Sequence, residues 1–189
     1  MAAKPGERRE QILQTLAAML ENPRSEKITT AALAARLSVS EAALYRHFAS
    51  KAQMFEGLIE FIETTVFSLI NKITAETANG VQQAEQIVGM LLGFAEKNPG
   101  MTRVLIGDAL VNEDERLQAR INQLYDRLEA TLKQSLRIAH TDAPQRLDPV
   151  AQAHALVAFV AGCWQRYAKT GFQRKPTEQW ELERAYLLG

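Results

Sequence analysis

The sequence predicts an all-α fold of about nine helices. Apolar residues recur three or four positions apart along nearly the whole chain, which is the spacing of one face of a helix. Alternating runs of β-branched residues bounded by turns, which would indicate strands, are absent from the sequence. Ten glycines and six prolines in 189 residues are ordinary for a globular protein. We therefore expect one domain, or a small module fused to a larger one that shares its helices.

The first helix is expected over residues 7–20. Ile12, Leu16 and Leu20 share one face of this segment at helical spacing. Asn22-Pro23 should stop the helix, because proline lacks the amide hydrogen that a helix needs. The apolar face requires a packing partner elsewhere in the chain.

Two short helices joined by a tight turn are expected next. Thr29 and Thr30 supply N-cap oxygens for a helix over residues 31–37. Ser40 caps a second helix over residues 41–47, whose first residue is acidic and therefore favourable beside the positive end of the helix dipole. The pair has the proportions of a helical hairpin.

The remainder of the chain should form six further helices. Turn sequences rich in Asn, Gly and Pro separate most of them. The expected spans are 50–77, 81–97, 101–110, 113–139, 150–170 and 176–188.

Charge is distributed unevenly along the chain. Residues 1–51 hold eight Lys and Arg against five acids, a net charge of +3, and residues 52–189 hold 14 against 17, a net charge of −3. A basic amino-terminal segment suits a polyanion such as nucleic acid. An asymmetry of this size also arises by chance, so charge alone leaves both interpretations open.

Several classes of protein are excluded by composition. The single cysteine, Cys163, forms neither an intrachain disulfide nor a thiolate cluster, and three scattered histidines lack zinc-ligand spacing. We expect no metal, no cofactor and no enzyme activity, because no nucleophile has a positioned base. The longest weakly polar run, residues 150–164, is shorter than the roughly 20 residues needed to span a bilayer. The amino terminus lacks an apolar signal segment, so a cytoplasmic location is expected.

Residues 28–51 have the spacing of a helix-turn-helix, in which a first helix braces a second that enters the DNA major groove. Exposed residues of the second helix would approach base edges, and hydroxyl, imidazole and ammonium groups around it would hold phosphates. Ala32, Leu33, Leu37, Val39 and Leu44 are expected to bury the inner faces. The candidate DNA-contacting residues are Thr29, Thr30, Ser40, Glu41, Ala42, Ala43, Tyr45, Arg46, His47 and Lys51. The alternative is a helical hairpin in which Tyr45 and Phe48 are merely core aromatics.

Residues 39–51 read Val-Ser-x-x-x-Leu-Tyr-x-His-Phe-x-Ser-Lys and resemble the signature of TetR-type regulators. The segments EAALYRHFASK, LIEFIE, LLGFAEKNPGMTR and ERLQARINQLYDRLEA are similar to the nucleoid occlusion factors of that family. The resemblance implies a TetR-like fold, with a DNA-binding domain over residues 1–51 and a dimerisation and partner-binding domain over residues 52–189. One departure is Ser38, because TetR-type turns often carry glycine there to adopt a left-handed backbone.

The resemblance also implies a nucleoid-associated homodimer that binds a near-palindromic DNA site and antagonises the division protein FtsZ. Helical periodicity places Phe61 outside the buried stripe of the central helix, whereas Phe67 is expected to pack. By resemblance, the carboxy-terminal tail of FtsZ would bind at Phe61, Met90, Gly93, Lys97 and Asn98. The rival functions are a repressor released by a small ligand and a purely structural helical protein.

The dimer is expected to form through two carboxy-terminal helices of each subunit, as the resemblance implies. The alternative is that their apolar rows are intramolecular core, which is the usual role of one face of an amphipathic helix. The expected interface residues are Leu117, Ile121, Leu124, Leu128, Leu156, Phe159, Val160 and Trp164.

Overall fold

A computed structural model describes residues 5–22, 28–142 and 147–189 of the chain. Within these ranges it holds nine α-helices, one short 3-10 helix and no strand, which confirms the all-α prediction. The elements are α1 (Pro5–Leu20), α2 (Thr30–Arg36), α3 (Glu41–Tyr45), α4 (Lys51–Glu76), α5 (Gly80–Lys97), α6 (Pro99–Leu105), η1 (Asp108–Leu110), α7 (Glu115–Asp142), α8 (Pro149–Lys169) and α9 (Trp180–Leu188).

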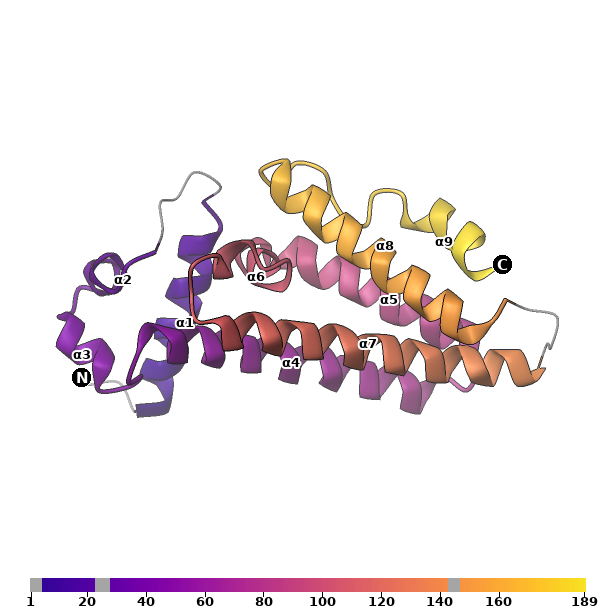
Figure 1. Cartoon of the computed structure of the whole chain (residues 1–189), viewed down its shortest axis with the longest axis horizontal. Coiled ribbons are helices and arrows are strands. Elements are labelled where there is room, and N and C mark those ends of the chain that lie inside the picture. Colours follow the sequence, from indigo (N-terminus) through magenta and orange to yellow (C-terminus); the bar gives the residue numbers. More distant parts are fainter. Residues whose placement is uncertain (1–4, 23–27, 143–146) are drawn as a thin grey trace.

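The helices form two groups, which we call the head (α1–α3) and the body (α4–α9). The head lies at one end of an elongated molecule, and α4 runs from it along the length of the body beside α7 (Figure 1). Helices α5 and α8 pack against α7, and α9 lies against α5 and α8. Helix α1 also contacts α4 and α6, so the head is joined to the body along a shared surface.

Side-chain caps set the helix starts that the sequence predicted. The Thr29 hydroxyl accepts a hydrogen bond from the Ala32 amide, and the Ser40 hydroxyl accepts one from the Ala43 amide. Thr30 is the first residue of α2 rather than a cap. The predicted caps of the two short helices are therefore confirmed at Thr29 and Ser40.

Two predicted helices are wrong in extent. The segment expected as one helix over 101–110 divides at Gly107, whose φ of 76° is left-handed and ends α6 before η1 begins. The last helix begins at Trp180 instead of Pro176, because residues 176–179 form turns. Buried Trp180, rather than the proline, anchors its first turn.

The residues predicted to cross the dimer interface are interior residues of one chain. Seven of the eight have 0–1% of their surface exposed, and the eighth, Phe159, is half-buried against the Trp180 ring with 5.8 Å between centroids. The assignment of these seven to an interface is wrong, because α5, α7 and α8 pack their rows against one another, whereas Phe159 stays a prediction. The seven buried residues are Leu117, Ile121, Leu124, Leu128, Leu156, Val160 and Trp164.

The outer face of α8 remains uncovered. It carries exposed Ala151, His154, Ala155, Ala158 and Gly162. In the part of the chain that the structure describes, no helix has the length and apolarity to cross a membrane.

Candidate DNA-binding face and partner surface

Helices α2 and α3 pack as a helix-turn-helix. Leu33, Leu44 and Phe48 are fully buried between them and the rest of the head. The prediction for Ala32 is wrong: it is exposed, and Ala34 is buried beside Leu33, because the inner face of α2 runs through Leu33, Ala34 and Leu37. Leu37 and Val39 are half-buried around the turn.

The turn between the two helices uses a left-handed residue. Ser38 has a φ of 55°, the conformation for which the family often uses glycine. The turn is held by the Val39 amide, which donates to the Ala34 carbonyl over 3.0 Å. Serine is thus tolerated at a position where its Cβ costs some free energy.

Three polar side chains form a cluster across α2 and α3 on the exposed side of the head. The Thr30 hydroxyl donates to the Glu41 carboxylate over 2.6 Å, and the Tyr45 hydroxyl lies 3.5 Å from the Thr30 oxygen, to which it donates. All three side chains reach solvent. The cluster fixes the positions of two hydroxyls that are suited to phosphate oxygens.

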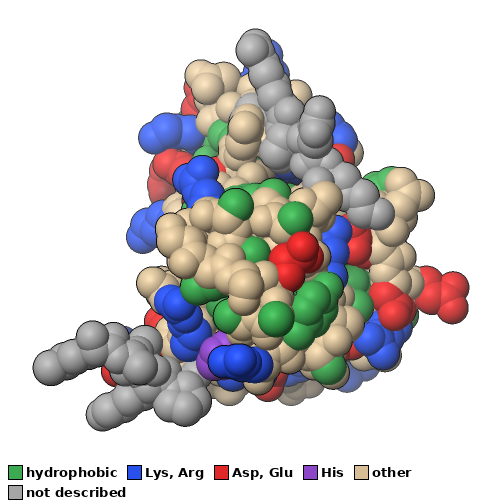
Figure 2. Space-filling model, turned by 90° about the vertical axis from the view of Figure 1, so that its left-hand side faces the viewer, with side chains coloured by type: hydrophobic (Ala, Val, Ile, Leu, Met, Phe, Trp, Pro, Cys, Tyr) green, Lys and Arg blue, Asp and Glu red, His purple; other side chains and the backbone are tan. Residues whose placement is uncertain are grey.

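The exposed side of α3 also presents Ala42 and Arg46, with Ala43 half-buried beside them. Figure 2 views this end of the molecule: lysine, arginine and histidine side chains lie around the edge of the face, and hydrophobic and acidic side chains lie nearer its centre. A positive rim around a short exposed helix fits the phosphates that flank a DNA groove. We call the exposed surface of Thr30, Glu41, Ala42, Tyr45 and Arg46 the DNA face.

Helix α1 supports the end of α3 through Arg9, a residue that the motif did not single out. Its guanidinium donates to the His47 carbonyl over 2.5 Å and stacks 4.1 Å from the centre of the Phe48 ring. The His47 side chain is half-buried. The sequence shows two neighbouring basic residues here, Arg8 and Arg9, but it does not indicate which groups they contact.

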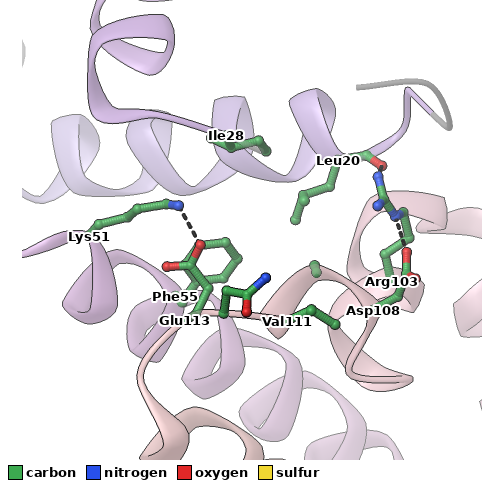
Figure 3. Close-up of a pocket in the computed structure, with 10 residues that line it drawn as sticks. Leu20, Ile28, Lys51, Phe55, Arg103, Asp108, Val111 and Glu113 are labelled. Carbon is green, nitrogen blue, oxygen red and sulfur yellow. Dashed lines mark hydrogen bonds and ion pairs between the residues drawn. The ribbon is translucent and has the colours of Figure 1, made fainter. Parts of the chain in front are cut away.

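Lys51 does not lie on the DNA face. Its ammonium is 2.5 Å from the Glu113 carboxylate, and the two side chains are only 20% and 10% exposed. Figure 3 shows this pair inside a hollow of about 220 Å³ between the head and the loop before α7, with Phe55 beneath it. In the DNA-free protein a body carboxylate therefore neutralises Lys51, and the expected phosphate contact would have to replace Glu113.

A second ionic group lies in the same hollow (Figure 3). Arg103 donates to the Asp108 carboxylate over 2.8 Å and to the Leu20 carbonyl at the end of α1 over 3.3 Å. Lys169 of α8 donates to the other oxygen of Asp108 over 2.6 Å. Burial opposes ionisation of Asp108, but the hydrogen bonds from Lys169 and Arg103 outweigh it and lower the pKa of this carboxyl group.

One glycine allows α1 and α6 to approach closely. A Cβ at Gly100 would lie 2.0 Å from the backbone oxygen of Ala17. We call this contact and the ion pairs Lys51–Glu113 and Arg103–Asp108 the joint between head and body.

The residues expected to hold a partner peptide are only partly brought together. Phe61 is 46% exposed on α4, as periodicity predicted, and Phe67 is half-buried under the Arg127 guanidinium. A groove beside Phe61 has a volume of about 380 Å³ and is lined by Glu10, Leu13, Gln14, Leu58, Phe61 and Met101. Its second wall is α1, which the sequence interpretation did not include.

The other expected peptide contacts lie on and just after α5. Lys97 is exposed, Met90 and Gly93 are half-buried, and a side chain at Gly93 would meet only open space. The Asn98 amide is already engaged, since it donates to the Phe94 carbonyl over 2.7 Å. None of these four lines the groove beside Phe61.

Comparison with known proteins agrees with this architecture. The model of the bacterial regulatory proteins of the tetR family matches residues 26–58, and that of the tetracyclin repressor-like, SlmA-like carboxy-terminal domain matches residues 78–188. A TetR transcription regulator from Haloarcula marismortui has a TM-score of 0.80 at 16% identity over 97% of each chain, which confirms the TetR-like fold.

Two curated relatives extend the similarity to nearly full length. The nucleoid occlusion factor SlmA of Alteromonas mediterranea is 52% identical over 94% of this chain and 92% of its own length. The corresponding factor of Idiomarina loihiensis is 47% identical over 100% of this chain and 99% of its own length. The chain therefore belongs to the SlmA family of TetR-type regulators.

Proposed function

We propose that this protein is a nucleoid occlusion factor, a DNA-bound homodimer that antagonises FtsZ and so blocks septum formation over the chromosome. The observation that carries the proposal is the sequence identity of 52% and 47%, over nearly the full length, to relatives of that name. The exposed helix-turn-helix supports it. The nucleoid is then where the protein acts, through its binding sites on chromosomal DNA.

On the DNA face, the roles follow from chemistry and exposure. Arg46 and Glu41 are the side chains with the reach to read base edges, since Arg pairs with guanine and Glu accepts from cytosine N4. Ala42 and Ala43 are small enough to let α3 approach the bases. Thr30 and Tyr45 supply hydroxyls for phosphates, so losing either should weaken binding to all sequences similarly.

For the dimer we propose the outer faces of α8 and α9, since the inner rows are occupied by the core. Small residues on α8 permit close approach of a second copy, and α9 adds Leu182 and Tyr186, which are 66% and 87% exposed. A twofold dimer would present two recognition helices to half-sites about 34 to 36 Å apart or multiples of that spacing. Sedimentation tests it: Ala158→Glu should give folded monomers, whereas Leu128→Glu should unfold the chain.

For FtsZ we propose its carboxy-terminal tail as the contacting segment, bound by Phe61 on α4 and by Met90, Gly93, Lys97 and Asn98 on and just after α5. An exposed aromatic supplies apolar contact, and the Lys97 ammonium suits an acidic peptide.

The test combines selection of bound DNA with capture of purified FtsZ. Selection from random duplexes should enrich a near-palindrome, and the DNA-bound protein should capture full-length FtsZ but not FtsZ that lacks its tail. An enriched palindrome without FtsZ capture would indicate an ordinary repressor. No enrichment at any salt concentration would reject DNA binding altogether.

A further inference from the structure

Three charged side chains connect the outer helix α8 to the end of α1. Lys169, the last residue of α8, donates to one carboxylate oxygen of Asp108 over 2.6 Å. Arg103 of α6 donates to the other oxygen over 2.8 Å and to the Leu20 carbonyl, at the end of α1, over 3.3 Å (Figure 3). We call Lys169, Asp108 and Arg103 the ionic bridge. It runs from the helix proposed for the dimer contact to the DNA-binding head.

The centre of the ionic bridge is fixed on the body. Asp108 follows Gly107, whose left-handed turn packs closely against a side chain of α7. Helix α6, which carries Arg103, is also held to α7, because the Tyr125 hydroxyl donates to the Leu105 carbonyl over 3.2 Å. The guanidinium of Arg103 therefore has a defined position on the body. A change in the angle of α1 must break or stretch its hydrogen bond to the end of that helix.

The other contacts of α1 with the body constrain its angle less. A Cβ at Gly57 of α4 would lie 3.3 Å from a methyl carbon of Leu13, and Gly100 of α6 lies against the Ala17 backbone. Apolar contacts are non-directional, whereas hydrogen bonds depend on angle. The contact at Ala17 thus gives α1 a point about which it can tilt. The hydrogen bond from Arg103, one turn further along α1, fixes the tilt.

The tilt of α1 decides where the recognition helix lies. Near the other end of α1, Arg9 donates to the His47 carbonyl just after α3 and stacks on the Phe48 ring. Arg9 and Leu20 are eleven residues apart, which is about 16 Å along a helix. A tilt of about 10° at the Leu20 end therefore moves the Arg9 end by about 3 Å, close to the rise of about 3.4 Å per base pair. A small change in this angle is enough to shift the head by about one base pair.

We propose that the ionic bridge sets the separation of the two recognition helices, and with it the spacing of DNA half-sites that the dimer accepts; the inference rests on the DNA-bound homodimer proposed above. Each subunit carries one ionic bridge, between the helix that would meet the second copy and the helix that supports the end of α3. The DNA face then selects the bases within a half-site, and the ionic bridge selects the distance between two half-sites. Its three members are positioning residues, since none of them belongs to the DNA face.

The first test varies the distance between half-sites. Duplexes carry two copies of the half-site that selection enriches, at the best spacing or one base pair longer or shorter. One base pair adds about 3.4 Å and about 35° of rotation, so wild type should bind the altered duplexes roughly tenfold more weakly. Lys169→Met should reduce this spacing penalty by about two- to fivefold, the range for one partly exposed ion pair. Lys169→Arg keeps the charge and should keep the penalty.

The matched control is an ion pair that joins two parts of the body. The Lys175 ammonium lies 3.1 Å from the Glu96 carboxylate, and the two side chains are 65% and 24% exposed, against 56% and 25% for Lys169 and Asp108. Lys175→Met should therefore retain the wild-type spacing penalty. Asp108→Asn removes both ion pairs of the ionic bridge and should reduce the penalty at least as much as Lys169→Met. A wild-type penalty in both Lys169→Met and Asp108→Asn would overturn the inference.

Duplexes with a single half-site separate this inference from the proposed function. Affinity for one half-site, and base preference within it, should equal those of wild type in all of these variants. If wild type binds two half-sites no better than one, the proposed DNA-bound dimer itself fails. If wild type requires two half-sites and every variant has the same spacing penalty, the dimer stands and only the role of the ionic bridge is rejected.

A distance measurement tests the ionic bridge without DNA. A spin label on Ala35→Cys, at an exposed position of α2, reports the separation of the two heads in a dimer, and the natural Cys163 is buried. The distribution of distances between the two labels should be wider in Lys169→Met than in wild type by about 3 Å or more, the displacement expected from a tilt of about 10°. Lys175→Met should have the wild-type distribution. Equal widths in all three proteins would show that the ionic bridge does not hold the heads.

Discussion

The DNA face and the joint beneath it are both polar, but they are built in opposite ways. On the face, Thr30, Glu41 and Tyr45 reach solvent and bond to one another across two short helices. In the joint, Lys51 and Glu113 are largely shielded and bond across 62 residues of sequence. Exposed hydrogen bonds exchange readily with water or phosphate, whereas shielded charges left unpaired cost free energy. Substitutions on the DNA face should therefore change DNA affinity, and those in the joint should change the free energy of unfolding.

The largest effect is expected at the glycine of the joint. Gly100→Ala would place a Cβ 2.0 Å from the Ala17 oxygen, and a helix backbone cannot move aside as a side chain can. We expect a loss of about 3 kcal/mol in the free energy of unfolding, at the upper end for overpacking. Gly93→Ala is the control: it meets open space and should gain roughly 0.5–1 kcal/mol as a helical alanine. Urea unfolding of the two variants measures both, and a Gly100→Ala protein as stable as wild type would contradict the close contact.

The second prediction compares two basic residues of the same motif. Lys51→Met leaves the shielded Glu113 carboxylate without its ammonium and should cost roughly 1–3 kcal/mol of stability. Arg46→Met should leave stability unchanged and shift base preference, at roughly 1–3 kcal/mol for the lost base contact.

Unfolding curves and DNA titrations at several salt concentrations separate the two outcomes. The salt dependence of DNA binding should be unaltered in Lys51→Met, because its charge is already neutralised by Glu113. Adding Glu113→Gln to Lys51→Met should recover part of the lost stability. If Lys51→Met has wild-type stability and its DNA binding depends less on salt concentration, Lys51 contacts a DNA phosphate, as the sequence predicted.

Contacts between residues close together in the sequence could be predicted, whereas contacts between distant residues could not. Caps at Thr29 and Ser40 were predictable because donor and acceptor lie three residues apart. The exposure of Phe61 followed from periodicity along one helix. The Lys51–Glu113 pair joins residues 62 apart, and no local pattern indicates it.

The misassigned dimer residues illustrate the same limit. Periodicity identified the apolar faces of α7 and α8, including Leu128 and Trp164, correctly as buried surfaces. It carried no information on whether the covering helix belongs to the same chain or to a second copy. In the structure α5 covers them, and the Trp164 indole donates to the Leu91 carbonyl of that helix over 3.2 Å.

A smaller effect is expected from the hydroxyls of the DNA face. Tyr45→Phe removes only an oxygen that bonds weakly to Thr30, so stability should stay within about 0.5 kcal/mol of wild type. DNA affinity should fall by about 1 kcal/mol, equally for specific and unrelated duplexes. Ser68→Ala, which removes an exposed hydroxyl from α4, is the control and should bind DNA as wild type does. A change in base preference in Tyr45→Phe would instead indicate that the phenol reads a base.

The smallest effect is a pH dependence at the second ionic group of the joint. Hydrogen bonds from Lys169 and Arg103 outweigh burial and hold the pKa of Asp108 below its ordinary value of 3.8. Near that pH the unfolded chain therefore binds more protons at this site than the native chain, so the contribution to stability rises with pH. It is fully present above the unfolded pKa and is lost as pH falls through the lower, native pKa.

Asp108→Asn should accordingly lower the melting temperature by about 2 °C or less at pH 7, the range for one partly exposed ion pair in a chain of this size. The deficit should stay constant while the pH lies well above 3.8 and shrink as the pH falls through the lower, native pKa, because wild-type Asp108 then becomes neutral. Asp126→Asn, on the exposed side of α7, corrects for the general titration of carboxylates. A deficit that persists undiminished at pH 2 would mean that Asp108 stabilises the joint by its shape and hydrogen bonds, and its charge contributes nothing to the connection between α1 and α8.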